Sequence, residues 1–424
     1  MKTFAPKALA LLVGLLPTAN AAADWPQFRG VNRDAQSTEK GLLQQWPTGG
    51  PKLAWQVTGL GGGYSSVSIQ NGRLFTMGDI GTDQFVIALS LDTKAILWKT
   101  KIGPAWTEDR YAGPRGTPTA DGDVIYAIGT EGDLVALEAA TGKLRWKKSL
   151  PGDFGGKVMS GWKWAESPLV DGDRLIVTPG AASALMVSLE KASGKEIWRT
   201  KAGEMGPQGR DGAGYSSVVI SNGAGVKQYV QLMGRGVVGV RASDGKFLWS
   251  YNKVANDTAN ISTPLVTGDY VFAATGYQTG SGLVKLSKAG DGVVATEQYF
   301  LDGKTFQNHH GGMVLIGNHV YAGHGHNNGF PMCLELASGK VVWGGNFRND
   351  GSGSAAVTAA DGHLYFRYQN GVMMLIEANP KQYREKGKFQ IPGVRNPSWS
   401  HPVVTGGRMY LREQDALHVY DVKR

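Results

Sequence analysis

The sequence predicts an all-β fold: an eight-bladed β-propeller of four-stranded antiparallel blades. Three observations lead to this prediction: an internal repeat, a Gly-containing turn at a constant place in each copy, and a Trp at the end of many copies. The chain has 424 residues, with 61 Gly, about twice the average share of ~7%, and 12 Trp. Hydrophobic residues make up 42% of the chain, which excludes intrinsic disorder.

One unit recurs along the chain. It begins with a small-Ser/Thr-Pro-apolar stretch and a hairpin turn, continues through two apolar runs, and ends in Thr/Ser-x-Gly-Lys-x-x-Trp. The clearest copies are 116–146 and 167–198. The first turns of the copies, about 45 to 50 residues apart, are expected at Asn71-Gly72, Asp121-Gly122, Asp171-Gly172, Asn222-Gly223, Gly268-Asp269, Gly317-Asn318, Asp361-Gly362 and Gly406-Gly407.

Each copy reads as a β-meander. Short β-rich runs such as 124–128 and 134–137 are separated by Asx-Gly pairs, which supply the positive φ that tight hairpins require. A four-stranded sheet that is apolar on both faces must stack on its neighbours, and a ring of such sheets is a propeller. Copies five and seven lack the Gly-Lys-x-x-Trp ending, so we expect irregular outer strands there.

The two ends of the chain predict how the ring closes. The last copy has no terminal Trp strand, whereas an orphan strand at 53–57, which contains Trp55, precedes the first copy. We therefore expect the N-terminal strand to complete the last blade. This gives an N-terminal extension at 22–52 and a propeller at 53–424.

The first 21 residues have the pattern of a signal peptide. Lys2 and Lys7 flank the start of a short apolar run at 8–16, and Ala19-Asn20-Ala21 matches a cleavage site. We expect a periplasmic or secreted, monomeric protein without a transmembrane anchor. The only Cys, Cys333, lies far from the cleavage site, so no lipid anchor is expected.

The charge does not indicate a nucleic-acid partner. The formal net charge is +9 at pH 7, but Lys and Arg are scattered and many lie in turns. Nucleic-acid binding proteins gather basic residues into a patch or stripe. Together with export, this scatter excludes DNA or RNA as the expected partner.

The repeat resembles a known family. The segment 136–146, Ala-Leu-Glu-Ala-Ala-Thr-Gly-Lys-Leu-Arg-Trp, is similar to the pyrroloquinoline-quinone (PQQ) repeat, and the likeness covers 53–424. The resemblance implies an eight-bladed quinoprotein dehydrogenase or a non-enzymatic relative, such as a scaffold lipoprotein of outer-membrane β-barrel assembly. Residues 24–52 resemble the leader of exported PQQ-repeat proteins of unassigned function.

The tryptophans divide into two groups. Those at repeat ends are expected to pack between blades: Trp55, Trp98, Trp146, Trp198, Trp249 and Trp343. The other six are Trp25, Trp46, Trp106, Trp162, Trp164 and Trp399, and four of these lie in loops between copies.

Long loops between copies are the expected binding face. The loops at 103–115, 151–166 and 203–214 are rich in Trp, Tyr and Arg, and loops of this length are usually functional or disordered. They project from the face opposite the first turns. The candidate ligand- or cofactor-binding residues are Trp106, Asp109, Arg115, Trp162, Trp164, Glu166, Arg210, Asp211 and Trp399.

Copy six contains a histidine cluster. Its members are His309, His310, His324 and His326, with His401 of copy eight as a candidate fifth. Neutral imidazole is a common metal ligand, so these residues are the candidate metal site. The alternatives are that they organise the Gly-rich loops, hydrogen-bond an anionic ligand, or lie apart on the surface.

Three functions remain open at this point. The first is a module that binds a small molecule or an envelope protein. The second, implied by the resemblance, is a dehydrogenase with PQQ stacked on a Trp and Ca²⁺ held by oxygens of Glu166, Asp109, Asp211, Asn260, Asn327 and Asn328. Against it, the chain is shorter than the alcohol-oxidising members and lacks their adjacent Cys pair and a haem-binding Cys-x-x-Cys-His. The third is a scaffold in envelope protein assembly.

Overall fold

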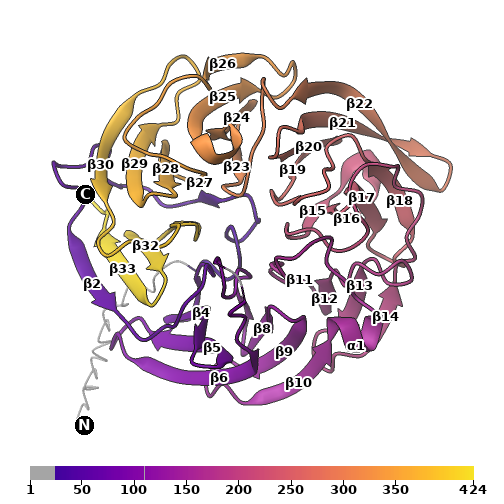
Figure 1. Ribbon diagram of the computed structural model, residues 1–424, viewed down its shortest axis with the longest axis horizontal. Coiled ribbons are helices and arrows are strands. Elements are labelled where there is room, and N and C mark those ends of the chain that lie inside the picture. The colour runs from indigo at the N-terminus through magenta and orange to yellow at the C-terminus, as the bar shows by residue number, and fades with distance from the viewer. Residues whose placement is uncertain (1–23, 109) are drawn as a thin grey trace, which may run out of the picture.

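Eight blades, each with four antiparallel strands, surround a central axis in the computed structural model, which describes residues 24–108 and 110–424 (Figure 1). The predicted eight-bladed propeller is therefore confirmed. The predicted signal peptide, 1–21, lies outside the described residues. The short helix α1 (Leu150–Phe154) follows the outer strand of blade 2. Within the described ranges, no helix has the length and apolar character needed to cross a membrane.

Strands run in chain order from the axis to the rim of each blade. Blade 1 contains β3 (Ser68–Gln70), β4 (Arg73–Ile80), β5 (Asp83–Ser90) and β6 (Ile96–Pro104); blade 2 contains β7 (Thr119–Asp121), β8 (Val124–Ile128), β9 (Asp133–Glu138) and β10 (Leu144–Ser149). Blade 3 contains β11 (Leu169–Asp171), β12 (Arg174–Val177), β13 (Val187–Glu190) and β14 (Glu196–Arg199); blade 4 contains β15 (Val219–Ser221), β16 (Gln228–Met233), β17 (Gly236–Arg241) and β18 (Phe247–Tyr251).

The second half repeats this order. Blade 5 contains β19 (Leu265–Thr267), β20 (Tyr270–Thr275), β21 (Gly280–Ala289) and β22 (Gly292–Asp302); blade 6 contains β23 (Met313–Ile316), β24 (His319–His324), β25 (Phe330–Glu335) and β26 (Val341–Gly344). Blade 7 contains β27 (Ala355–Ala360), β28 (His363–Tyr368), β29 (Val372–Glu377) and β30 (Glu385–Gln390); blade 8 contains β31 (Val403–Thr405), β32 (Arg408–Glu413), β33 (Ala416–Asp421) and β2 (Leu53–Val57). Each of the eight predicted first turns joins the innermost strand of a blade to its second strand.

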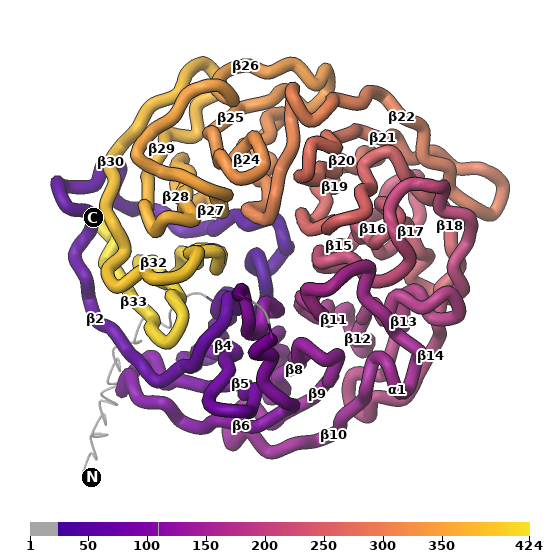
Figure 2. Tube along the Cα trace, in the orientation of Figure 1, coloured from indigo at the N-terminus to yellow at the C-terminus, as the bar shows by residue number. Residues whose placement is uncertain are grey.

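The N-terminal strand closes the ring. β2 pairs antiparallel with β33, with Trp55 opposite Val419 and Gln56 opposite His418. Figure 2 shows β2 at the rim of the molecule beside β33. The predicted closure is therefore confirmed, and both ends of the chain contribute to one sheet.

The expectation of irregular outer strands in copies five and seven is wrong. β22 pairs with β21 from end to end apart from one bulge, and β30 pairs with β29 with one bulge, as the other outer strands do. In blade 5 the phenol of Tyr299 takes the place of the missing Trp, because its hydroxyl donates to the Leu336 carbonyl of the next blade at 2.6 Å. The motif is absent, but an aromatic donor at the same place performs the same packing.

Tryptophans at the repeat ends connect neighbouring blades. The indole N–H of Trp146 donates to the Lys191 carbonyl at 3.1 Å, and that of Trp198 donates to the Ala242 carbonyl at 3.2 Å. The ring of Trp198 lies against Gly245 of blade 4, where a Cβ would come within 2.5 Å of it. The Gly of the Thr/Ser-x-Gly-Lys-x-x-Trp motif is thus the surface on which the Trp of the preceding blade packs.

The N-terminal extension crosses the central channel. We call its first part, residues 24–37, the N-terminal strap; it is the indigo segment across the middle of the ring in Figure 1. Trp25 exchanges two backbone hydrogen bonds with Ile69 of blade 1. Further along, the strap ends in β1 (Gln36–Ser37), which adds a parallel fifth strand to the inner edge of blade 7. The chain then leaves the channel and reaches the rim at β2.

Replacing Trp198 with Ala tests the inter-blade packing. Trp198 is 8% exposed, and removing a buried indole is expected to lower the free energy of unfolding by about 3–5 kcal/mol. The neighbouring Ile197 is 43% exposed, so Ile197→Ala should change stability by only about 0.5 kcal/mol. Urea denaturation of both variants measures the difference. Equal, small losses for the two variants would contradict the role given to Trp198.

Candidate functional site

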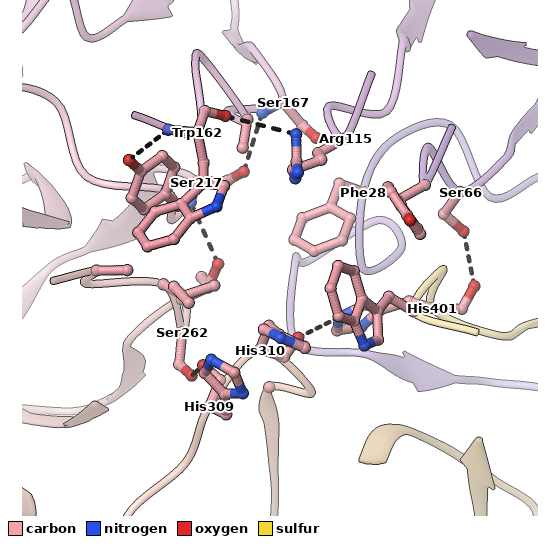
Figure 3. A pocket seen from close by; sticks show the side chains of 18 of the residues that line it. Phe28, Ser66, Arg115, Trp162, Ser167, Ser217, Ser262, His309, His310 and His401 are labelled. Atoms are coloured by element: carbon pink, nitrogen blue, oxygen red, sulfur yellow. Dashed lines mark hydrogen bonds between the residues drawn. The ribbon is translucent and has the colours of Figure 1, made fainter. Parts of the chain in front are cut away.

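A cavity of about 310 Å³ lies around the axis among the inter-blade loops, and we call it the central cavity (Figure 3). It is lined by the loops that enter blades 1 to 6 and 8, by turns between second and third strands, and by the strap. The aromatic residues of its lining are Phe28, Tyr64, Tyr111, Trp162, Tyr215, Tyr277 and Trp399. The predicted binding face is therefore hollow at the axis and largely aromatic.

The strap forms the floor of this cavity. Phe28 and Arg29 line the central cavity, whereas Val31 and Arg33 line a second hollow on the other side of the strap. The strap thus divides the propeller channel into two separate spaces. Ligands that enter from the loop face meet Phe28 and Arg29 instead of an open channel.

Arg33 anchors the strap to the inner strands. Its guanidinium is buried and donates to the carbonyls of Val218, Ser167 and Pro168, in blades 4 and 3. Burial lowers the pKa of Arg33 to about 10, while the carboxylate of Glu166 acts in the opposite direction. These carbonyls belong to residues directly before β11 and β15, and the bonds to them hold Arg33 and the floor in place.

A chain of hydrogen bonds to hydroxyl groups runs past the cavity from blade 1 to blade 5; we call Ser66, Thr117, Ser167, Ser217 and Thr263 the hydroxyl belt. The backbone N–H of each of the first four residues donates to the hydroxyl of the next, at 3.2, 2.9, 3.0 and 3.3 Å. The hydroxyl of Ser66 continues the belt by donating to the His401 carbonyl at 2.7 Å. The Ser/Thr near the start of each of the first five copies therefore connects adjacent blades near the axis.

Arg115 lies in an aromatic setting. Its guanidinium is 4.9 Å from the ring centroid of Trp106 and 5.6 Å from that of Tyr64, which is the geometry of cation–π contacts. It also donates to the Tyr111 carbonyl at 2.6 Å. Trp399 packs against Tyr64 and Tyr111, with centroids 4.8 and 4.9 Å apart. The 103–115 loop thereby places a cation and several rings on one wall.

Three histidines pack against one another on another wall, with their rings tilted. The ring centroid of His309 lies 3.8 Å from that of His310 and 3.9 Å from that of His326. The nitrogens of His309 contact the Ser354 hydroxyl at 2.8 Å and the Tyr277 hydroxyl at 3.1 Å. Desolvation lowers the pKa of His309 and of His401 to about 3, and that of His310 falls well below its usual value for the same reason. These imidazoles are neutral at pH 7.

The structure brings together some of the sequence-predicted residues at the cavity. The residues that line it are Arg115, Trp162, Trp399, His309, His310, His326 and His401. Trp106 lies behind Arg115 and is 5% exposed. His324 is also buried behind the wall, where its Nδ1 accepts from the Gln307 N–H at 3.2 Å. Asp109 lies outside the described residues.

The remaining candidates lie elsewhere. Trp164 packs in the apolar core between blades 2 and 3, and Glu166 is buried with one oxygen bonded to the backbone and hydroxyl of Thr178. Burial raises the pKa of Glu166 to about 7. Arg210 is exposed, and Asp211 forms ion pairs with Arg235 and Lys157. None of these four side chains lines the central cavity.

The described donors do not form a metal site. Among residues 24–108 and 110–424, no three or more His, Cys, Asp or Glu side chains are arranged to hold a metal ion. Of the described oxygen donors proposed for Ca²⁺, Asn327 alone lines the cavity. Asn260, for example, donates instead to the carbonyls of Met233 and Gly234. A Ca²⁺ ion takes six to eight oxygen ligands, which this donor set does not supply.

Sequence reasoning missed several lining residues. Phe28 and Arg29 stand in the leader, whose path through the channel no local pattern reveals. Tyr64 and Tyr215 each begin a Tyr-Ser-Ser-Val segment, at 64–67 and 215–218, directly before an innermost strand. This recurrence could have identified both tyrosines, because the Ser two residues later belongs to the hydroxyl belt.

The neutral histidines predict a pH dependence of stability. An unfolded His takes up a proton near pH 6.5, whereas folded His309 stays neutral until about pH 3, so the unfolded state binds more protons between these values. The contribution of such a His to the free energy of unfolding should be fully present above pH 6.5. It should fall as the pH is lowered, by up to roughly 1.4 kcal/mol per pH unit for each such His. Urea denaturation between pH 7.5 and 5 measures this slope. His309→Gln should flatten it; parallel curves for both proteins would contradict the assignment.

Comparison with known proteins shows the family. A PQQ-repeat family model described as outer membrane protein assembly factor BamB matches residues 82–345. Tetrathionate hydrolase of Acidithiobacillus ferrooxidans is 23% identical over 294 residues, which cover 66% of this chain and 53% of the hydrolase. The assembly factor BamB of Xanthomonas campestris is 31% identical over 134 residues, 31% of this chain and 29% of that protein. The chain thus matches about half or less of these relatives.

Solved structures share the fold. BamB from Moraxella catarrhalis has a TM-score of 0.58 at 14% identity, with 88% of this chain and 99% of that chain covered. Quinohemoprotein alcohol dehydrogenase from Comamonas testosteroni has a TM-score of 0.61 at 12% identity, with 95% and 81% covered. The chain belongs to the PQQ-repeat β-propeller family whose model is described as outer membrane protein assembly factor BamB.

Proposed function

We propose that this propeller binds a small molecule in the central cavity. The observation that carries the proposal is the strap, which closes the channel beneath the cavity with Phe28 and Arg29. A pocket of about 310 Å³ with aromatic walls and a few polar groups has the size and character of small-molecule sites in proteins. Because the strap lies beneath the cavity, a ligand would enter it from the loop face.

The packing of the walls supports a preformed site. Tyr215 bonds to the Ser160 hydroxyl at 2.7 Å and accepts from the Trp162 N–H at 3.3 Å, which holds the Trp162 wall. The Trp399 indole donates to Gln369 at 2.8 Å. Because these rings are fixed by their neighbours, a ligand would lose little affinity to the ordering of side chains.

A PQQ-dependent dehydrogenase is the alternative implied by the family. The described residues do not fit its Ca²⁺, because Glu166 and Asp211 lie away from the cavity and no described carboxylate lines it. No catalytic step through PQQ follows from these residues. Assembly of envelope proteins, the role in the description of the matching family model, is a further alternative for the exposed rims of the loops, and export to the periplasm would suit either function.

A cavity-filling variant tests the proposal. Ala165 lines the central cavity, whereas Ala182 is exposed in a turn of the same face. We expect some aromatic fragments, drawn equally from neutral, anionic and cationic compounds, to bind the wild-type protein in calorimetric titration. Ala165→Phe should weaken this binding by about tenfold or more, because it occupies the ligand space, while Ala182→Phe should leave it unchanged.

Two results would contradict the proposed function. One is the absence of any fragment that binds the folded wild-type protein. The other is binding that Ala165→Phe leaves unchanged, since the ligand would then occupy another surface. PQQ, titrated with and without Ca²⁺, belongs in the same series; binding that requires Ca²⁺ would favour the dehydrogenase alternative.

A further inference from the structure

The N-terminal strap bonds to one repeated position of the inner strands. The backbone N–H groups of three inner-strand residues donate to carbonyls of the strap at 2.7 to 2.8 Å: Ile69 in blade 1, Ala120 in blade 2 and Ala359 in blade 7. Each lies one residue before the pair that borders the first turn of its blade. Because bonded and non-bonded pairs alternate along an antiparallel ladder, the backbone groups at this position point away from the second strand and toward the channel.

Blades 3 to 6 have the same position without a strap partner. It is occupied by Val170, Ile220, Val266 and Leu315, and we call these four residues the open edge. Within the described ranges, their backbone N–H and C=O groups have no backbone hydrogen-bond partner outside their own blade. A strand with such unpaired groups is an edge strand, which can accept a further strand.

The whole open edge lines the second hollow. This hollow has a volume of about 640 Å³ and lies on the side of the strap away from the central cavity. Its lining includes Asn222 and Gly317 from the first turns of blades 4 and 6, which place it toward the turn face. Figure 1 shows β11, β15 and β19 across the channel from β27, the strand that β1 covers. The strap thus occupies one side of the channel and leaves the other side to the second hollow.

The second hollow is mostly apolar and its charges are compensated. Arg33 and Asp34 are the only charged residues among its described lining. Each nitrogen of the Arg33 guanidinium donates a hydrogen bond, and Asp34 lies close enough to Arg29 to stabilise the positive charge of that residue. Val31 of the strap is 63% exposed and adds an apolar side chain to the lining. An uncharged, apolar segment therefore suits this space better than a charged one.

We propose that the second hollow binds an extended, uncharged apolar segment of a partner protein, which pairs through its backbone with the open edge. Addition of a strand to an exposed sheet edge is a recurrent mode of peptide recognition. The strap supports this choice of occupant, because its own extended backbone pairs with the equivalent edges of blades 1, 2 and 7. The segment enters from the turn face, since the strap separates the hollow from the central cavity. This interaction is separate from the small-molecule site and goes beyond the proposed function.

Amide hydrogen exchange in the wild-type protein tests the edge itself. The four amides of the open edge should exchange at least about tenfold faster than the amides of Ile69, Ala120 and Ala359, because only the latter three donate to the strap. Two-dimensional NMR measures each rate. Equal protection of the two groups would overturn the inference, because the open edge would then already be paired.

Peptides test the occupant. A set of capped pentapeptides that alternate Val with Thr, Ser or Gln favours the extended conformation and carries no charge. Calorimetric titration of the full chain should show binding, and exchange of the open-edge amides should slow by about tenfold or more in the complex. The best peptide with every backbone nitrogen methylated keeps its side chains but loses its N–H donors, so it should bind at least about tenfold more weakly. Glu or Lys at the polar positions should weaken binding by a similar factor, about tenfold.

Two valine variants locate the site. Val31→Trp places a large ring in the second hollow and should weaken peptide binding at least about tenfold. Val294→Trp adds the same ring to β22 at the rim of blade 5, where Val294 is 46% exposed, and should leave the affinity unchanged. Circular dichroism compares the folds of the two variants.

Three further results would contradict the inference. One is that no peptide of the set binds the wild-type protein. Another is that the methylated peptide binds as tightly as its parent, or that Val31→Trp leaves binding unchanged, since backbone pairing in the hollow would then not be responsible. The third is a wild-type dimer in sedimentation that Val31→Trp abolishes, which would make a second copy the occupant. The exchange rates and the methylated peptide decide the inference even if a variant does not fold, and fragment binding that Ala165→Phe weakens is unaffected by any of these outcomes.

Discussion

The inner edges of the blades impose the constraint on which the cavity depends. In a propeller the closed ring gives every blade a neighbour on each face. The innermost strand of each blade nevertheless still presents backbone groups to the channel. The N-terminal strap partners some of them: β1 pairs with β27, and the guanidinium of Arg33 donates to the Val218, Ser167 and Pro168 carbonyls. These contacts hold the strap in the channel, and the strap in turn forms the floor of the central cavity.

The backbone of the strap is unusual in the same place. Arg29, Arg33 and Ala35 have φ values of 64°, 57° and 59°, in the left-handed region that residues with a Cβ seldom occupy. Such conformations persist where the surroundings determine them more strongly than local preference does. Here the two arginine side chains and the pairing of β1 supply that determination. The left-handed residues let a short segment present Arg29 to one side of the strap and Arg33 to the other.

Much of the fold could be predicted because the repeat encodes it locally. The Asx-Gly and Gly-Gly pairs allow the positive φ of the first turns, and the Gly of Gly-Lys-x-x-Trp accommodates the indole of the preceding blade. Tyr299 shows the limit of this reasoning, because it forms the same inter-blade contact although it lies outside the motif. A motif describes one solution to a packing problem, and the structure accepts others that satisfy the same geometry.

The candidate site was predictable in part. Arg115, Trp162, Trp399 and most of the histidines were expected on one face, because they lie in loops whose side of the ring follows from strand order. Loop position does not determine whether a side chain turns inward, so Trp164 and Glu166 were grouped with residues from which burial separates them.

By itself, the sequence determined the number of blades, the turns between their inner strands, the strand that closes the ring and the face with the long loops. These features depend on periodicity and on residues that act over short distances. The tertiary structure alone decided that the strap crosses the channel, that Arg29 lies buried beneath the cavity, and that aromatic residues from distant blades surround one space. The reason is physical: these contacts join residues hundreds of positions apart, and their energies depend on burial and on unpaired backbone groups that exist only once the ring has closed.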